Sequence, residues 1–208
     1  MTADIEYFYS THSAFAYLGS ARFMAIARAA GRPIVHRPFD FGPVLRAARG
    51  AGFSGFSPAH RAYFFGREIE RWSQFRGAPA IAHRPTHHDN DLSLSSGMII
   101  AAAEAGRDPG DLAHAILEAH WRDDADHADP ETLAAIAARA GYDAGVLLAR
   151  ARDREIQAQF KANTDEAIAR SVFGSPTYFV DGDMFYGQDR LELVEQALRA
   201  PFQGTWPR

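Results

Sequence analysis

The stretch FGSPTYFVDGDMFYGQDRLELVEQAL, residues 173–198, carries the clearest structural signal in the chain. Two short aromatic and β-branched runs, TYFV and MFYG, are typical of strands, and Asp181-Gly182 between them is a hairpin turn signal. The following DRLELVEQAL has a helical pattern, with Asp189 as the expected N-cap and Glu192 completing a capping box. The stretch therefore predicts a strand–strand–helix unit.

The N-terminal part of the chain predicts a strand–helix–strand unit. Residues 5–9 (IEYFY) have the composition of a strand, and a helical pattern begins at Ser13 and stops near Gly31. Residues 33–41 (PIVHRPFDF) predict a second strand, which prolines end. Because a short crossover of this kind usually joins parallel strands, we expect these two strands to pair in parallel.

The long middle of the chain, residues 42–171, contains almost no strand signal. Helices are expected to start where an acidic residue precedes proline, at Asp108-Pro109 and Asp129-Pro130, and an apolar stripe follows each start. Residues 50–60 (GAGFSGFSPAH) are rich in Gly, Ser and Pro, which predicts a mobile loop. The middle is therefore predicted to be all-helical.

The two mixed units are each too small to bury a sheet alone, so we expect them to combine into one sheet. A β-α-β unit joined to a β-β-α unit is the order of the thioredoxin fold. The predicted fold class is α/β: a thioredoxin-like domain of residues 1–41 and 172–208, with an all-helical domain of residues 42–171 inserted between its two halves.

The composition is that of a soluble globular protein, with 47% hydrophobic and 23% charged residues among 208. The formal net charge of −4 argues against nucleic acid or an anionic membrane as the main partner. The absence of cysteine excludes disulfides, thiolate metal sites and dithiol redox chemistry. No secretory signal is visible, and the longest apolar stretch (residues 98–106) is too short for a bilayer, so we expect a cytoplasmic location.

Three positions next to predicted strand ends carry groups suited to binding or reaction. Ser13 stands at a helix start, where the dipole favours an anion and a thioredoxin-like layout places its reactive residue; taken alone, it also fits a simple N-cap. A cis Ser175–Pro176 bond would turn the Ser175 backbone toward Ser13 as an edge for an extended peptide, although most X–Pro bonds are trans. Gln188 and Asp189 at the last helix start suit an α-amino acid head group.

Residues 173–198, together with YSTHSAFAYLG at residues 9–19, resemble the 2-hydroxychromene-2-carboxylate isomerase family. This family belongs to the thioredoxin superfamily and is related to the kappa-class glutathione transferases. The resemblance covers nearly the whole chain and includes REIERWSQFRGAP at residues 67–79 of the helical part. Its C-terminal motif is fairly specific, whereas the N-terminal match is looser.

The resemblance implies that glutathione is the cofactor. It implies that the hydroxyl of Ser13 faces the thiol of glutathione and assists it as a thiolate nucleophile. The residues that would bind glutathione are Ser175 beside a cis Pro176, the segment Gln188, Asp189 and Arg190, and Arg61 in the helical part. Members of the family are often dimers, so a homodimer is one expectation, although no sequence feature fixes the oligomeric state.

The site departs from the family pattern at its first turn. Relatives usually read Asp-Phe-x-Ser-Pro, where this chain has Ser10-Thr11-His12-Ser13-Ala14. His12 is therefore a titratable group beside the predicted site, either contacting a substrate or facing solvent as a loop residue. Aromatic residues that could wall a pocket for an aryl ring, or equally form plain core, are Phe15, Phe53, Phe56, Tyr63, Phe64 and Trp72.

The implied function is a glutathione-dependent cis–trans isomerase that acts on a small aromatic or conjugated carboxylate. Thiolate addition to the conjugated double bond, rotation and thiolate expulsion would give the trans product without a metal. A kappa-like glutathione transferase and a non-catalytic thioredoxin-fold binding module are the alternatives. Residues 83–91 (HRPTHHDND) and 120–129 (HWRDDADHAD) mix histidines with carboxylates, but they lack the spacing of a helical metal site, so we expect solvated loops and no metal.

Overall fold

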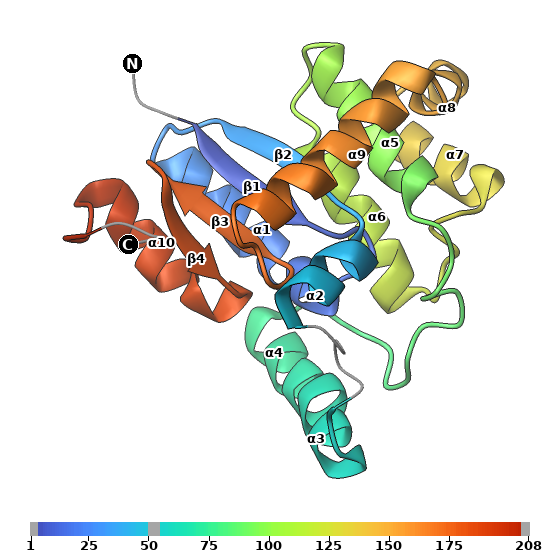
Figure 1. The fold of residues 1–208 in the computed structure, drawn as a ribbon. Coiled ribbons are helices and arrows are strands. Elements are labelled where there is room, and N and C mark those ends of the chain that lie inside the picture. Colours follow the sequence, from blue (N-terminus) through green and yellow to red (C-terminus); the bar gives the residue numbers. More distant parts are fainter. Residues whose placement is uncertain (1–3, 50–54, 205–208) are drawn as a thin grey trace.

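The computed structural model describes residues 4–49 and 55–204, and a four-stranded sheet in the order β2-β1-β3-β4 forms their centre (Figure 1). The strands are β1 (Ile5–Tyr9), β2 (Ile34–Pro38), β3 (Thr177–Val180) and β4 (Asp183–Tyr186). β1 pairs in parallel with β2 and antiparallel with β3, and β3 pairs antiparallel with β4. Each end of the chain thus contributes two strands, which confirms that the two mixed units combine into one thioredoxin-like sheet.

Helices occupy most of the remaining chain. α1 (Ala14–Ala29) connects the two parallel strands, and the 3₁₀ turn η2 (Gln188–Arg190) leads from β4 into α10 (Leu191–Arg199). The helices between β2 and β3 are α2 (Phe41–Arg49), α3 (Pro58–Ala62), the π-helical turn η1 (Tyr63–Arg67), α4 (Glu68–Arg76), α5 (Ser93–Glu104), α6 (Gly110–Arg122), α7 (Pro130–Arg139), α8 (Ala144–Ala151) and α9 (Arg154–Ala169).

The alternation of side chains along β1 gives the sheet two apolar faces. On one face, the ring of Tyr7 stacks on that of Tyr178 with centroids 5.3 Å apart, and both belong to the core that includes α1 and α10. On the other face, Phe8 meets the edge of Phe179 at 5.5 Å, and α2 and α9 cover this pair. Two helices from the predicted insertion therefore pack on the sheet itself, while its division into a separate domain stays a prediction.

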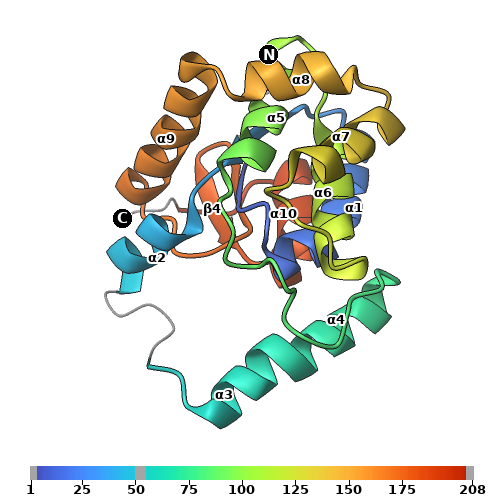
Figure 2. The same cartoon turned by 90° about the vertical axis from the view of Figure 1, so that its right-hand side faces the viewer.

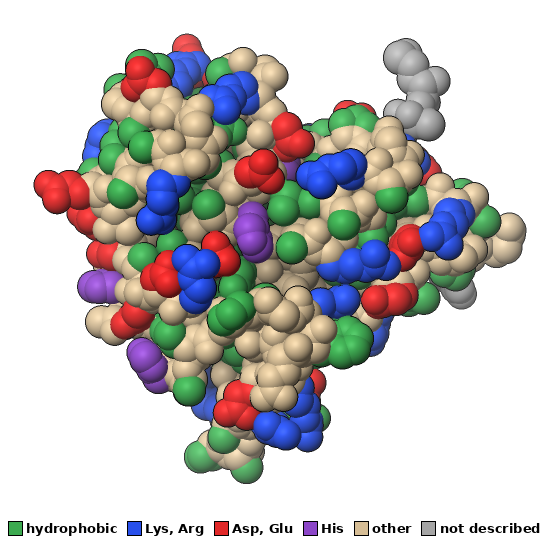
Figure 3. Space-filling view, turned by 180° about the vertical axis from the view of Figure 1, so that it is seen from behind, with side chains coloured by type: hydrophobic (Ala, Val, Ile, Leu, Met, Phe, Trp, Pro, Cys, Tyr) green, Lys and Arg blue, Asp and Glu red, His purple; other side chains and the backbone are tan. Residues whose placement is uncertain are grey.

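The segment from α3 to α4 forms a helical arm that stands apart from α5–α8 (Figures 1 and 2). On the back of the molecule, acidic and basic side chains lie interspersed (Figure 3). Arg22 on α1 and Glu195 on α10 form one ion pair that ties two helices together. Within the described part of the chain, no helix combines the length and apolar character needed to span a membrane.

Several predicted turns and caps are confirmed. Asp181 and Gly182 connect β3 to β4, both with positive φ (50° and 88°), as a tight hairpin of this handedness requires. Asp129 caps α7, its carboxylate accepting from the backbone N–H of Thr132 at 2.8 Å. Gly31 follows α1 with a φ of 63°, the conformation expected at a helix stop.

Other local predictions are wrong. The capping box at Asp189 does not form, because η2 intervenes, α10 begins only at Leu191, and the Asp189 carboxylate pairs with Arg190 at 2.7 Å. Asp108 accepts from the N–H of Gly110, so α6 starts one residue later than expected. In the predicted loop, residues 50–54 lie outside the described residues, and Ser57 caps α3 from Pro58 onward.

Gly19 on α1 lies against the turn that follows β4. A Cβ at this position would stand 2.5 Å from the Cβ of Gln188. We therefore expect Gly19→Ala to lower the free energy of unfolding by about 2 kcal/mol, the usual cost of overpacking a tight contact. Gly145→Ala on α8, where the nearest atom is 3.6 Å away, is the matched control and should be neutral or stabilising in denaturant unfolding. Equal stability of the two variants would contradict this packing.

Candidate active site

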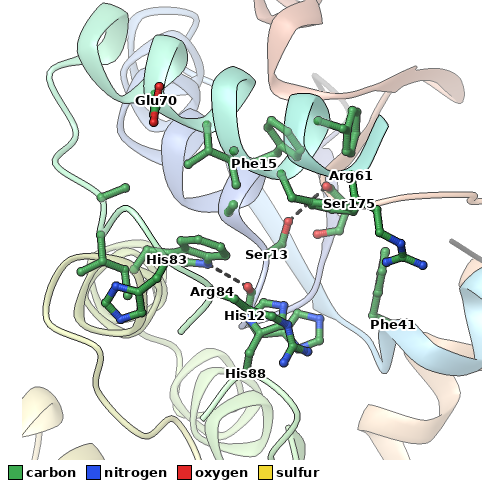
Figure 4. Close-up of a pocket in the computed structure, with 18 of the residues that line it drawn as sticks. His12, Ser13, Phe15, Phe41, Arg61, Glu70, His83, Arg84, His88 and Ser175 are labelled. Carbon is green, nitrogen blue, oxygen red and sulfur yellow. Dashed lines mark hydrogen bonds between the residues drawn. The ribbon is translucent and has the colours of Figure 1, made fainter. Parts of the chain in front are cut away.

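A cavity of about 540 Å³ opens at the N-terminus of α1, between the sheet, the α3–α4 arm and the segment that precedes α5 (Figure 4). Its apolar wall includes Phe15, Phe41, Phe64, Phe65, Ile69, Trp121 and Tyr186. Its polar lining includes His12, Ser13, Arg61, Glu70, His83, Arg84, His88, Asp89 and Ser175. The mixture of an aromatic wall with a few polar groups is typical of a small-molecule site.

Ser13 both caps α1 and faces the start of β3. Its hydroxyl accepts from the N–H of Ala16 at 3.2 Å and donates to the carbonyl of Ser175 at 3.1 Å. The Ser175–Pro176 bond is cis, as the resemblance implies, and the hydroxyl of Ser175 accepts from the N–H of Ser10 at 3.0 Å. The structure therefore brings Ser13 and Ser175 together at one end of the cavity.

The segment predicted to hold the γ-glutamyl end of glutathione lies outside the cavity lining. Gln188 is buried, and Arg76 on α4 donates to its side-chain and backbone oxygens at 3.2 Å each. Asp189 and Arg190 pair with each other at the surface. Tyr186, at the end of β4, is the cavity residue nearest to them in the chain.

Only some of the predicted aromatic residues line the cavity. Phe15 and Phe64 line the cavity with their ring centroids 5.1 Å apart, and Phe56 meets Phe64 edge-on at 6.0 Å. Tyr63 is half exposed and accepts from Arg71 instead of lining the cavity. Trp72 packs partly buried against the main core, and Phe53 lies outside the described residues. Sequence reasoning missed Phe41, Phe65 and Trp121 as lining residues.

His12 is packed into the cavity wall and is not a solvent-facing loop residue. Its carbonyl accepts from the indole N–H of Trp121 at 2.8 Å, and its ring stacks on His88 with centroids 4.5 Å apart. Phe41 meets the same ring edge-on at 5.8 Å. Burial, followed by the neighbouring His88, holds the pKa of His12 well below its ordinary value. The imidazole is therefore neutral near pH 7.

Three histidines from the two stretches considered for metal binding meet behind His12. His88 Nδ1 lies 3.1 Å from His120 Nε2, and His127 Nδ1 lies 3.2 Å from His120 Nδ1. His120 and His127 are buried, so solvated loops were the wrong prediction for them. Among residues 4–49 and 55–204, no group of three or more His, Cys, Asp or Glu side chains is placed to hold a metal ion.

The charged lining residues are mostly neutralised in pairs. Both terminal nitrogens of Arg84 donate to the carboxylate of Asp89, one of them at 2.8 Å, and Glu70 accepts from Arg67 at 2.9 Å. Arg61 lines the opposite part of the cavity, on the same side as Ser175 (Figure 4). Arg84 and Asp89 belong to the histidine-rich stretch at residues 83–91, which was the sequence signal for this part of the site.

Residues 4–199 match the DSBA-like thioredoxin domain. The chain therefore belongs to the DSBA-like thioredoxin domain family, as its sheet and cis-proline indicate. A 2-hydroxychromene-2-carboxylate isomerase of Sphingobium xenophagum is 28% identical to it over 199 residues, 95% of this chain and 99% of that protein. The protein of the same name from Pseudomonas putida is 25% identical over 195 residues, 93% of each chain.

Solved structures show the same fold. The structure of a selenomethionine 2-hydroxychromene-2-carboxylate isomerase gives a TM-score of 0.72 at 24% identity, covering 94% of both chains. A probable DsbA oxidoreductase from Streptomyces coelicolor gives a TM-score of 0.72 at 21% identity, covering 99% of this chain and 92% of its own. The thioredoxin-like fold and the resemblance to the isomerase family are both confirmed.

The buried histidines make stability depend on pH. In the folded protein, burial lowers the pKa of His88 to about 3 and that of His120 to about 4, whereas the unfolded chain titrates near 6.5. Below about pH 6.5 the unfolded chain binds more protons than the folded protein. The free energy of unfolding therefore decreases as the pH is lowered, by up to about 1.4 kcal/mol per pH unit for each histidine. Denaturant unfolding between about pH 7.5 and 4.5 measures this slope.

A matched pair of variants checks the origin of the slope. We expect His120→Gln to reduce the pH dependence, because the buried titrating group is gone. His87 is a partly exposed neighbour of His88, and its Nδ1 lies 3.5 Å from the carboxylate of Asp126. His87→Asn should leave most of the pH dependence in place. A slope that is equal in His120→Gln and the unaltered protein would contradict the assignment.

Proposed function

We propose that this protein is a glutathione-dependent cis–trans isomerase of the 2-hydroxychromene-2-carboxylate isomerase type. The observation that carries the proposal is the hydroxyl of Ser13, held at the N-terminus of α1 and 3.1 Å from the carbonyl of Ser175 within one cavity. The names of the relatives from Sphingobium xenophagum and Pseudomonas putida support the same reaction class.

The residues at this end of the cavity fit a cysteinyl tripeptide. The N-terminus of α1 offers free backbone N–H groups and the positive end of the helix dipole, which favour an anion. Ser175, next to the cis proline, supplies the backbone edge along which an extended peptide can lie. Arg61 brings a guanidinium to the same end for a terminal carboxylate.

Glutathione, when bound, supplies a thiol whose anion can add to a conjugated double bond and leave after rotation. The chain's own part is to stabilise that anion. A rotation about χ1 would turn the Ser13 hydroxyl from the Ser175 carbonyl toward the sulfur, where it donates a hydrogen bond. Together with the dipole of α1, this donor lowers the pKa of a thiol from its ordinary value of about 8.5.

The γ-glutamyl end would then extend out of the cavity past Tyr186. Asp189 and Arg190 lie on this outward route, as an exposed acid and base that can meet an ammonium and a carboxylate. Gln188 stays engaged by Arg76, so its contribution would be to hold the segment in place. Under this proposal, glutathione would contact Ser175 and Arg61 at the cavity and the segment after Tyr186 outside its lining.

The rest of the cavity suits the second substrate. Phe15, Phe41 and Phe64 offer aromatic surface to an aryl ring. Arg84, paired with Asp89, lines the cavity with the neutral rings of His12 and His88, and a substrate carboxylate would compete with Asp89 for its guanidinium. Because His12 is neutral, it would contact the substrate by hydrogen bonding or packing and not as a charge. We also propose a cytoplasmic location, where reduced glutathione is available.

Replacement of Ser13 tests the proposal. We expect Ser13→Ala to lower kcat at least tenfold, about 1.4 kcal/mol of barrier, because the thiolate loses its hydroxyl donor. The same change also removes an N-cap, which costs about 1 kcal/mol of stability. Asp143→Ala is the matched control, because Asp143 caps α8 through the N–H of Val146 at 3.1 Å. It should lose similar stability and keep full turnover.

The outcome for Ser13→Ala and two further measurements, on an aryl halide and on glutathione binding, separate the alternatives. Turnover of the hydroxychromene at an unchanged rate in Ser13→Ala would leave this residue as a helix cap only. Conversion of a chromogenic aryl halide without isomerisation would indicate a kappa-like glutathione transferase. Failure of glutathione to bind in calorimetric titration at millimolar concentration would reject the proposal in favour of a non-catalytic binding module.

A further inference from the structure

Three histidines, the buried His120 and His127 and the partly buried His88, form a hydrogen-bond chain that ends at the cavity. His120 Nδ1 lies 3.0 Å from the carbonyl oxygen of Ala125, and its Nε2 lies 3.1 Å from Nδ1 of His88. His127 Nε2 lies 3.2 Å from the carbonyl oxygen of Asn90. None of these contacts involves the residues predicted to bind glutathione. This chain of histidines therefore lies apart from that part of the site.

The two carbonyls fix the tautomer of every ring in this chain. A carbonyl oxygen only accepts, so the proton of neutral His120 is on Nδ1, and its Nε2 carries a lone pair. That lone pair accepts from Nδ1–H of His88. In the same way, His127 donates from Nε2 to Asn90 and turns its unprotonated Nδ1 toward Nδ1–H of His120. The partners therefore leave Nε2 of His88 without a proton.

Burial keeps all three rings in the neutral form that this assignment requires. It lowers the pKa of His88 to about 3 and that of His120 to about 4, and it lowers the pKa of His127 as well. A positive charge on any one ring would also be disfavoured by the others. The arrangement therefore persists as neutral imidazoles at physiological pH.

The ring of His88 is held in a fixed orientation at the cavity wall. It stacks on His12 with centroids 4.5 Å apart and meets the edge of Trp121 at 5.6 Å. His88 lines the cavity, and its Nδ1 is occupied by His120. Within the described chain, no residue forms a hydrogen bond to its Nε2. An unprotonated nitrogen that can accept a hydrogen bond is thus left at the cavity wall.

We propose that His88 accepts the proton of a hydroxyl group on the substrate, and that His120 is the positioning residue that keeps His88 in the required tautomer. The proposal rests on the proposed function and concerns the opening of the cyclic substrate before isomerisation. A 2-hydroxychromene-2-carboxylate carries the hydroxyl on the carbon that is bonded to the ring oxygen. Opening the ring requires that this hydroxyl lose its proton.

The step balances without another reagent. The hydroxyl proton passes to Nε2 of His88, the bond between the carbon and the ring oxygen breaks with its electron pair on the oxygen, and the former hydroxyl becomes a ketone. The imidazolium of His88 then returns the proton to the phenolate oxygen. When the substrate is bound, its carboxylate next to His88 raises the pKa of the His88 imidazole. The ring is then a better base than it is in the empty cavity.

Two substrates and one control variant test the proton transfer. One substrate is the cyclic hydroxychromene; the other is a cis-benzylidenepyruvate without the ortho hydroxyl, which has no ring to open. We expect His88→Gln to lower kcat on the cyclic substrate at least about 100-fold, in the range of general acid–base catalysis, and to change the open one by less than about threefold. His87→Asn, at a partly exposed neighbour outside the cavity, should convert both at the unaltered rate.

Either of two outcomes overturns the assignment to His88: equal losses on both substrates, or no loss on either. If the unaltered protein isomerises neither substrate with glutathione present, it is the proposed function that fails. The tautomer chain can still be tested in that case, because its measurement needs no substrate.

Two-bond ¹H–¹⁵N correlation spectra of the ¹⁵N-labelled protein read the tautomers directly. We expect Nδ1–H for His88 and His120 and Nε2–H for His127. His120→Gln, whose side-chain oxygen can replace the lost acceptor, should keep His88 as Nδ1–H and retain turnover of the cyclic substrate. His120→Leu should shift His88 to Nε2–H and lower that turnover alone. An Nε2–H signal for His88 in the unaltered protein would overturn the proposal.

Discussion

The hydroxyl of Ser13 donates to the carbonyl of Ser175 across 162 residues of sequence, and the hydroxyl of Ser175 in turn accepts from the N–H of Ser10. These two bonds hold the N-terminus of α1 against the start of β3. The helix dipole, the cis-proline edge and the cavity mouth meet at this junction. The strand pairing of β1 with β3 brings the two segments close, and the serine contacts set the orientation of the groups within the site.

The sheet and the Ser13 end of the site could be predicted because their signals are local. Two strands with a hairpin turn and a serine at a helix start are each encoded within a few residues. The capping box at Asp189 failed because Gly187, with a φ of 99°, lets the chain make an extra 3₁₀ turn before α10. Gln188 is then buried under Arg76, a contact between segments 112 residues apart that no local pattern shows.

The histidine chain could not be predicted for a related reason. His88 comes from the segment before α5, His120 from the C-terminal end of α6 and His127 from the turn after it. Each looks like a polar residue among carboxylates, which is the usual pattern of a solvated loop. Only tertiary packing shows that the carboxylates stay outside, with Asp126 engaging Asn90 and His87 at the surface, while the imidazoles turn inward. Sequence spacing carries no signal for that choice.

One departure from the family pattern, Ser10 in place of an aspartate, has a plain physical consequence. Ser10 is fully buried, so an uncharged side chain at this position avoids the cost of burying an ionised carboxylate. The described cavity carboxylates, Glu70 and Asp89, are each paired with an arginine, and the histidine rings are neutral. The N-terminus of α1 adds the positive end of a helix dipole to this cavity, and Arg61 lines the same part of it. A cavity of this kind favours two anions at once, a thiolate and a carboxylate, which is the pair that the proposed reaction has to bring together.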